Sequence, residues 1–381
     1  MRRVKTAAAM AALILGLGAG QALAGQASQS EFGRLPDGRA VEAVTLTNHR
    51  GMSARIIAYG AALQSLNVPD RKGRLADVVL AYPSIDGYLA KPQYFGAIVG
   101  RYANRIAGAT FSLDGQAYHV SASEGANSLH GGKVGFDKVL WTVDALKSGP
   151  VASATFTYVS PDGDQGYPGT LTVHVTYSLD ERDALTITYE ATTDKPTVVN
   201  LSNHSFFNLA GAASGHSILD DRIMIAADAY TPTDGGLIPT GQLVPVAGTP
   251  FDFRQPHRIG ERIRDGAEPQ LVQPKGYDHN FVLNAGVTAQ PKLAVRLDDA
   301  VSGRVMELWT TEPGVQFYSG NFLDGSSVGK DGEIYRQSDG LALEPQHFPD
   351  SPNHPAFPST RLDPGGRYRQ VSVYRFLTEP R

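Results

Sequence analysis

The sequence predicts an all-β protein built as a large antiparallel β-sandwich, and three observations lead to this fold class. Apolar and polar residues alternate in many short segments, turn-forming residues separate the segments, and no run of about a dozen residues shows helical periodicity. Strand-like segments continue from about residue 40 to 377 without a low-complexity linker or a detectable repeat. One domain over residues 25–381 is therefore the economical reading, and two smaller β domains are the alternative.

The individual strands follow from the alternation. In 171–179 (LTVHVTYSL) every second residue is apolar or aromatic, so one face packs on a core while the threonines and His174 face outward. The same pattern predicts strands at 153–160, 184–191, 222–230, 292–299 and 370–376. The stretches PDGDQGYPG, TDGG and DPGG between these segments are typical of turns.

The first 24 residues have the composition of a secretory signal peptide. Arg2, Arg3 and Lys5 form a basic start, an apolar stretch follows, and Ala22-Leu23-Ala24 offers a cleavage site. An N-terminal membrane anchor is the alternative, although the apolar run is short for a span. We therefore expect a periplasmic or secreted protein that is soluble after cleavage.

Charge and composition exclude several classes. Removing residues 1–24 would take away three basic residues and change the formal charge from −4 to −7, which does not favour nucleic acid. The sequence has no cysteine, so disulfides and thiol chemistry are excluded. We expect a monomer or a homodimer.

Polar residues in segments that otherwise look like core or tight turn are the candidate site. The stretch 198–211 (VVNLSNHSFFNLAG) reads as a strand that would place Asn200, Ser202, His204 and Phe206 on one face. Other segments supply the further candidates Asn104, Arg105, His130, Asp278, Gln316 and Glu344. Each alone has an ordinary structural explanation, such as a histidine bonded to a backbone carbonyl or an acid in a turn. Together they lack metal-ligand spacing and suit the many hydroxyls of a sugar.

The C-terminal stretch LALEPQHFPDSPNHPAFPST places Glu344 at the end of an apolar run, just before a loop with several prolines. We expect a strand to end at Glu344 and the prolines to stiffen the loop that follows.

These motifs resemble a known family. GRYANRI, NSLHGG, NLSNHSFFNL, GYDHNF, PGVQFYSGN and the C-terminal stretch occur in the order and context seen in aldose 1-epimerases, the galactose mutarotases. The resemblance implies a galactose mutarotase-like supersandwich and interconversion of the α and β anomers of free aldoses such as glucose and galactose, without cofactor or metal. It implies His204 as general acid and Glu344 as general base, with the sugar held by Asn104, Arg105, His130, Asp278 and Gln316. Phe206 departs from the family, where tyrosine is frequent, so one hydroxyl contact is in doubt.

Residue chemistry is compatible with these roles. Mutarotation needs a base for the anomeric hydroxyl and an acid for the ring oxygen, and one carboxylate with one imidazole suffices. We expect Glu344 to be ionised among hydrogen-bond donors, and His204 to be protonated, at the start of each turnover. With one arginine in the proposed site and no basic cluster, phosphorylated sugars are disfavoured.

Two other classes are open on the residues alone. A glycoside hydrolase or lyase would use two acids, for which Asp278 and Glu344 are the available pair. A non-catalytic carbohydrate-binding protein would present exposed aromatic residues as a flat platform instead of an enclosed pocket.

Overall fold

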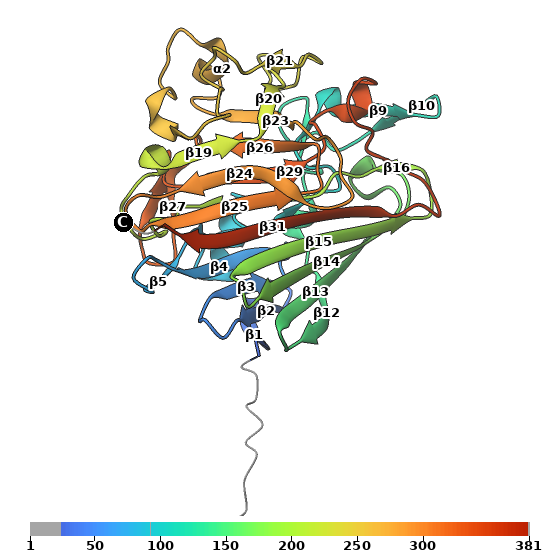
Figure 1. Cartoon of the computed structure of the whole chain (residues 1–381). Helices are drawn as coiled ribbons and strands as arrows, with labels where there is room; N and C mark the ends of the chain where they lie inside the picture. The colour runs from blue at the N-terminus through green and yellow to red at the C-terminus, as the bar shows by residue number, and fades with distance from the viewer. Residues whose placement is uncertain (1–23, 92, 380–381) are drawn as a thin grey trace, which may run out of the picture.

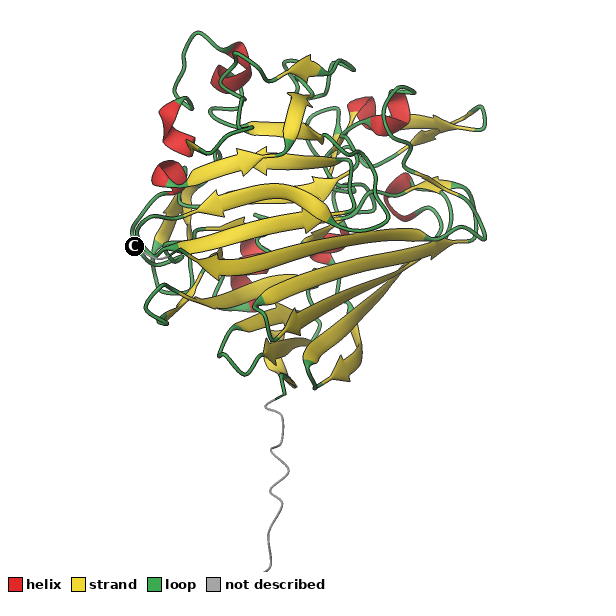
Figure 2. Ribbon diagram, viewed as in Figure 1, coloured by secondary structure: helices red, strands yellow, loops and turns green. Residues whose placement is uncertain are grey.

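The computed structural model describes residues 24–91 and 93–379, so most of the predicted signal peptide lies outside the described residues. Strands dominate and helices are short (Figure 2): α1 covers Ile85–Ala90 and α2 covers Pro269–Val272. The predicted all-β class is confirmed. No helix among the described residues has the length and apolar character needed to cross a bilayer.

The largest sheet has nine antiparallel strands and spans the front of Figure 1. Its order is β12 (Thr142–Lys147), β13 (Val151–Ser160), β14 (Leu171–Asp180), β15 (Ala184–Thr193), β31 (Tyr368–Thr378), β25 (Arg304–Thr310), β24 (Lys292–Asp298), β19 (Arg222–Ile225) and β22 (His257–Arg258). Alternate residues of these strands, such as Val173, Val175 and Tyr177 of β14, are fully buried, as the alternation predicted.

A seven-stranded antiparallel sheet packs behind it and carries the candidate site. Its order is β21 (Val244–Pro245), β20 (Ala227–Tyr230), β23 (Asp278–Leu283), β26 (Gly314–Tyr318), β29 (Leu341–Gln346), β18 (Phe206–Phe207) and β6 (Val79–Leu80). The two sheets share one core, where the ring of Phe207 in β18 lies 5.3 Å from that of Tyr374 in β31. This stacking of two apolar sheet faces is the predicted sandwich.

A third sheet of five strands closes the lower end in Figure 1. It comprises β1 (Gln26–Arg34), β2 (Ala40–Thr47), β3 (Ser53–Ile57), β4 (Ala62–Pro69) and β5 (Leu75–Asp77). Short two-stranded pairs connect the sheets: β9 (Thr110–Leu113) with β10 (Gln116–His119), β8 (Arg105–Ile106) with β11 (Ser128–Leu129), β7 (Ile98–Val99) with β17 (Ser202–Asn203), β16 (Thr197–Val198) with β30 (Arg361–Leu362), and β27 (Asp324–Val328) with β28 (Ile334–Arg336).

Two predicted strands differ in the structure. Residues 222–230 form two strands, because the chain passes from the nine-stranded sheet (β19) to the seven-stranded sheet (β20) at Ala226, whose N–H donates to Ala294 O. The segment 198–211 is no continuous strand either, since β17 and β18 pair with different neighbours, β7 and β29. Asn200, Ser202, His204 and Phe206 therefore do not form one face of one strand.

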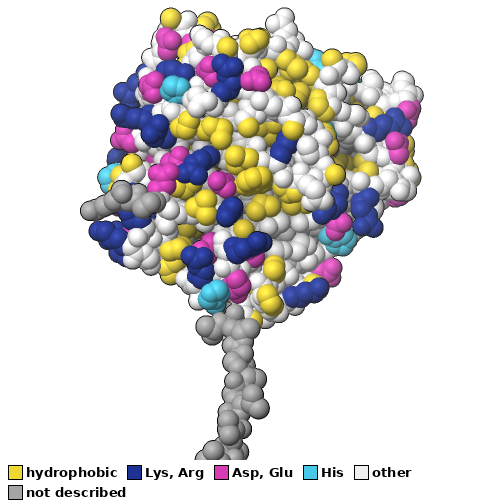
Figure 3. All heavy atoms as spheres, viewed as in Figure 1, with side chains coloured by type: hydrophobic (Ala, Val, Ile, Leu, Met, Phe, Trp, Pro, Cys, Tyr) yellow, Lys and Arg dark blue, Asp and Glu magenta, His cyan; other side chains and the backbone are white. Residues whose placement is uncertain are grey.

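The face of the molecule in Figure 3 mixes charges of both signs. Arg296 of β24, for example, pairs with Asp298, Glu307 and Glu379. Interspersed acids on this face leave no extended basic surface there.

Candidate active site

The predicted site residues meet at a cavity of about 150 Å³. Six of the seven line it, namely Asn104, Arg105, His130, His204, Asp278 and Glu344, and Gln316 lies beside Asp278, to which its Nε2 donates at 2.7 Å. A volume below the 300–1,000 Å³ of typical drug-sized pockets suits one monosaccharide. This partly open cavity also differs from the flat aromatic platform of a non-catalytic module.

Three adjacent strands of the seven-stranded sheet form one wall. In their register Gln316 of β26 lies opposite Glu344 of β29 on one side and Asn280 of β23 on the other, while Asp278 lies opposite Tyr318. Because side chains alternate between faces, the neighbours Phe317 and Leu343 point into the core. The sheet therefore fixes the acids on one face by packing apolar residues on the other.

Glu344 lies within β29 and not at its end, which corrects the expectation from the sequence. The strand continues through Pro345 to Gln346, although proline cannot donate to a sheet ladder. The carbonyl of Pro345 accepts from Ser202 Oγ at 2.8 Å and from Gln370 Nε2 at 3.0 Å. These side-chain contacts hold the chain extended directly after Glu344.

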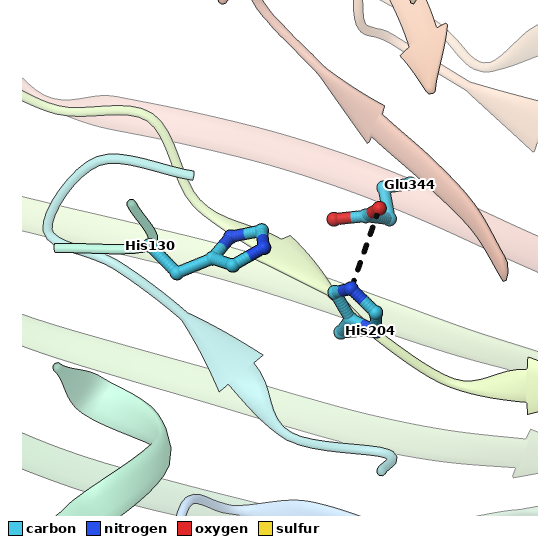
Figure 4. Close-up of side chains that lie close together, drawn as sticks. All are labelled: His130, His204 and Glu344. Carbon is cyan, nitrogen blue, oxygen red and sulfur yellow. Dashed lines mark ion pairs between the residues drawn. The ribbon is translucent and has the colours of Figure 1, made fainter. Parts of the chain in front are cut away.

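His204 faces Glu344, with Nε2 3.6 Å from Oε1 (Figure 4). The backbone on either side is fixed, because His204 N donates to Ala97 O and His204 O accepts from Gly96 N. Both side chains are less than a tenth exposed. This is a pair of titratable groups held rigidly against one cavity.

Burial acts on the ionisation of this pair in the direction opposite to our expectation. Burial lowers the pKa of His204 to about 4, and burial, reinforced by the nearby Asp278, raises the pKa of Glu344 well above its usual value despite the opposing charge of Arg105. Nor is Glu344 surrounded by donors: its buried Oε2 receives no hydrogen bond from a described residue. The unliganded site thus favours neutral His204 and protonated Glu344.

His130 approaches from the other side, its ring centre 5.2 Å from that of His204 (Figure 4). Its Nδ1 accepts the backbone N–H of Asn104 at 3.1 Å, which places the ring proton on Nε2. The turn that follows requires glycine, because a Cβ on Gly131 (φ 91°) would lie 1.8 Å from Gly100 O.

His130, His204 and Glu344 lie close enough together to hold a metal ion. One donor atom from each of the three lies within 4.8 Å of the others. A ring N–H on His130 Nε2, however, offers a hydrogen-bond donor and not a ligand lone pair. The chemistry of these groups therefore fits a sugar oxygen better than a metal ion.

Glu124 is a site residue that sequence reasoning missed. Its carboxylate accepts from Arg105 Nε at 2.5 Å and from Arg105 Nη2 at 2.8 Å, a bidentate pair that orients the buried guanidinium. In the sequence, Glu124 stands before Gly125 and looks like a turn acid. Only its pairing with Arg105 distinguishes it.

Four aromatic residues complete the lining, and of these the sequence pointed only to Phe206. Tyr94, Phe206, Tyr318 and Phe322 border the cavity, and the Tyr94 ring lies 4.7 Å from His130 and 5.5 Å from His204. Phe206 has no hydroxyl, but Tyr318 beside it has one, which accepts the Phe322 N–H at 2.8 Å and keeps its own proton to donate.

The proline-containing loop after β29 holds the backbone at Arg105 and Ala107 through hydrogen bonds. Asp350 N donates to Arg105 O at 2.8 Å, and Asp350 Oδ1 accepts from Ala107 N at 2.9 Å. Asn200 likewise binds the backbone of His347 through both its amide atoms. The polar residues of this loop and of 198–211 therefore position Arg105 and β29, while His204 faces the cavity.

Comparison with known proteins shows the relationships of the chain. The family model described as Aldose 1-epimerase matches residues 42–375. The chain is 47% identical over 350 residues to a galactose mutarotase from Rattus norvegicus, covering 92% of this chain and 98% of that protein. It is 40% identical over 346 residues to an aldose 1-epimerase from Escherichia coli strain K12, covering 90% and 97%.

Solved structures agree with these matches. A galactose 1-epimerase from Lactobacillus acidophilus NCFM superimposes with a TM-score of 0.82 at 27% identity, over 93% of this chain and 99% of that one. A GalM/aldose epimerase homologue from C. elegans gives a TM-score of 0.79 at 32% identity, over 87% and 97%. The shared architecture extends over the whole sandwich.

Proposed function

This chain belongs to the aldose 1-epimerase family, and we propose that it interconverts the α and β anomers of free aldoses such as glucose and galactose. The observation that carries the proposal is the buried pair His204–Glu344 at 3.6 Å, facing a cavity the size of one monosaccharide. One imidazole and one carboxylate supply the two proton transfers that ring opening requires.

In the proposed reaction, Glu344 takes the proton of the anomeric hydroxyl while His204 donates a proton to the ring oxygen. The C1–O5 bond breaks and its electron pair goes to O5, while the electrons of the O1–H bond form the new C1=O1 double bond. The aldehyde then rotates about the C1–C2 bond, and ring closure on its other face returns both protons. Each positioned group contributes roughly 10²–10⁴-fold to the rate.

The His204–Glu344 pair carries the same number of titratable protons before substrate binds and at the start of the proposed reaction. Burial favours neutral His204 with protonated Glu344, whereas these roles need imidazolium and carboxylate. Moving one proton between the two groups connects these states without exchange with solvent. Sugar hydroxyls supply the donors that Glu344 lacks, and hydrogen bonds to a carboxylate favour its charged form.

The remaining residues hold the sugar. His130 Nε2–H, Asn104 and Arg105 present donors, while Asp278 and the Gln316 carbonyl oxygen, which is buried without a partner among the described residues, accept from hydroxyls. Such paired donors and acceptors suit hydroxyl groups, each of which both donates and accepts.

Export completes the proposal. The basic start, apolar stretch and Ala22-Leu23-Ala24 site support a signal peptide over residues 1–24. We therefore place the enzyme in the periplasm or outside the cell. N-terminal sequencing of the protein recovered after cell fractionation tests this, since an intact Met1 would contradict cleavage.

Polarimetry tests the activity directly. Purified protein should accelerate the change in optical rotation of freshly dissolved α-glucose or α-galactose, and Glu344→Gln should remove most of the acceleration while leaving the fold intact. Asp144→Asn, the same change on an exposed acid of β12, is the matched control and should keep the wild-type rate. A Glu344→Gln variant with a near-wild-type rate would refute the assigned base.

A further inference from the structure

Acidic groups outnumber cations around the cavity. Glu124, Asp278 and Glu344 line it, and Arg105 is the only Lys or Arg among the described residues that do so. His130 and His204 add little positive charge, because burial lowers the pKa of both imidazoles. Glu344 holds its proton in this site and Glu124 is paired with Arg105, so the excess negative charge that a ligand meets is that of the Asp278 carboxylate.

The guanidinium of Arg105 already forms an ion pair with Glu124. Glu124 accepts from Nε and Nη2 of Arg105, so a carboxylate or phosphate on a sugar would have to compete with an ion pair formed within the protein. An anionic sugar would also face the Asp278 carboxylate at close range. The cavity thus disfavours anions both by repulsion and by lack of a free cation.

The other two acids make no ion pair with a described Lys or Arg, although the charge of Arg105 acts on both. Asp278 Oδ1 accepts from the neutral amide of Gln316, and Glu344 Oε2 accepts from no described residue. The pKa of each carboxyl is raised, chiefly by burial, which is the behaviour of acids whose charge is poorly compensated. A positive group on the ligand would supply the missing charge and up to three N–H donors.

Reaction geometry brings one sugar position close to these acids. The anomeric carbon must lie between His204 and Glu344, so the substituent on the adjoining carbon, C2, lies next to the same wall of the cavity. In that wall Gln316 stands opposite Glu344 and donates to Asp278. A C2 substituent therefore faces a row of acceptors.

We propose that the enzyme also takes aldoses that carry an ammonium group at C2, the 2-amino sugars, and that Asp278 selects them over aldoses bearing a carboxylate or phosphate. The proposal rests on the mutarotase function given above and adds a charge-based substrate class to it. The selecting group is the Asp278 carboxylate, and Glu124 contributes by keeping Arg105 engaged.

Three sugars of similar size test the proposal. Polarimetry with the wild-type enzyme should compare glucose, glucosamine hydrochloride and glucuronate at a pH where the amine is protonated, each rate being divided by the spontaneous rate of that sugar. A unit charge about 6 Å from one uncompensated charge, at an effective dielectric of about 20, changes affinity roughly a hundredfold. We expect kcat/KM for glucosamine to exceed that for glucuronate by at least this factor.

Two variants and a control assign the selectivity. Asp278→Asn should lower the glucosamine-to-glucuronate ratio tenfold or more, and Glu124→Gln should raise the relative use of glucuronate by freeing Arg105. Asp144→Asn changes the net charge equally on an exposed strand and should leave the ratio unchanged. These ratios compare sugars within one variant, so a general loss of activity does not alter them.

The outcomes separate this inference from the function on which it rests. Turnover of glucose with equal use of glucosamine and glucuronate would overturn the charge selection alone. No acceleration with glucose or galactose would overturn the mutarotase function itself. A ratio that stays at the wild-type value in both Asp278→Asn and Glu124→Gln would show that these acids are not the selecting groups.

Discussion

The pH dependence of kcat/KM should show a bell whose two limbs belong to the His204–Glu344 pair, and replacing His204 should change the acidic limb. The active free enzyme carries one proton on the pair. Gain of a second proton, by His204 with a pKa of about 4, should form the acidic limb. Loss of the only proton, from Glu344, whose pKa burial raises well above the ordinary value, should form the basic limb.

His204→Asn should therefore lower the slope of the acidic limb by one proton and leave the basic limb in place, whereas Glu344→Gln should remove the basic limb. The shift of the His204 pKa from 6.5 to about 4 corresponds to roughly 3 kcal/mol of burial cost for the imidazolium, which keeps the plateau open at neutral pH. At the plateau each variant should be slower by roughly 10²-fold or more.

The assay is polarimetry of α-glucose between about pH 3 and 10, corrected at each pH for spontaneous mutarotation. Other titratable groups face the pair: His130, Asp278, Glu124 and the hydroxyls of Tyr94 and Tyr318. Asp278→Asn is the control, because an acidic limb that belongs to His204 persists in it. An unchanged acidic slope in His204→Asn would refute our assignment, and His130 would be the next residue to test.

Four further changes test binding, stability or metal dependence as follows. Glu124→Gln should raise KM several-fold with a smaller change in kcat, because Arg105 loses its orienting carboxylate; an equal fall in kcat would contradict a positioning role. Ser202→Ala should lower the free energy of unfolding by about 1 kcal/mol in denaturant titrations, since Pro345 O loses a donor. Dialysis against a chelator should leave mutarotation unchanged; a loss restored by a divalent ion would show metal dependence. Buried His279, its pKa lowered to about 3, adds stability that is fully present above about pH 6.5 and is lost as pH falls towards 3; denaturant titrations at pH 7 and 4 that agree would contradict this.

The sheets could be predicted wherever one face is buried. Residues 171–179 alternate strictly because every second side chain enters the core, and the structure places a strand there within one residue of the predicted end. Failures occur where the chain leaves a regular sheet. At Ala226 the alternation continues across a change of sheet, so the sequence cannot show that 222–230 serves two layers.

Most of the cavity could be named from the sequence, because polar residues between apolar neighbours are unusual in strands. Glu124 escaped since an acid before a glycine is common in surface turns, and its function depends on Arg105, nineteen residues away in sequence. Asn200 and Ser202 were grouped with His204 because they too are polar residues between apolar neighbours. Their side chains hold His347 and Pro345, contacts that no local pattern shows.

Ionisation is the property that the sequence could least predict, and Pro345 shows why. Read as a strand terminator, it leaves Glu344 at the edge of a polar loop, where water and donors would keep a carboxylate charged. In the structure, Ser202 and Gln370 satisfy the Pro345 carbonyl, β29 continues, and Glu344 is buried at the centre of a sheet opposite Gln316. The same contacts that extend the strand therefore remove Glu344 from water and raise its pKa. In the proposed mechanism, Glu344 holds its proton until a sugar supplies hydrogen-bond donors and becomes a base only then, which couples the chemistry to the presence of the sugar.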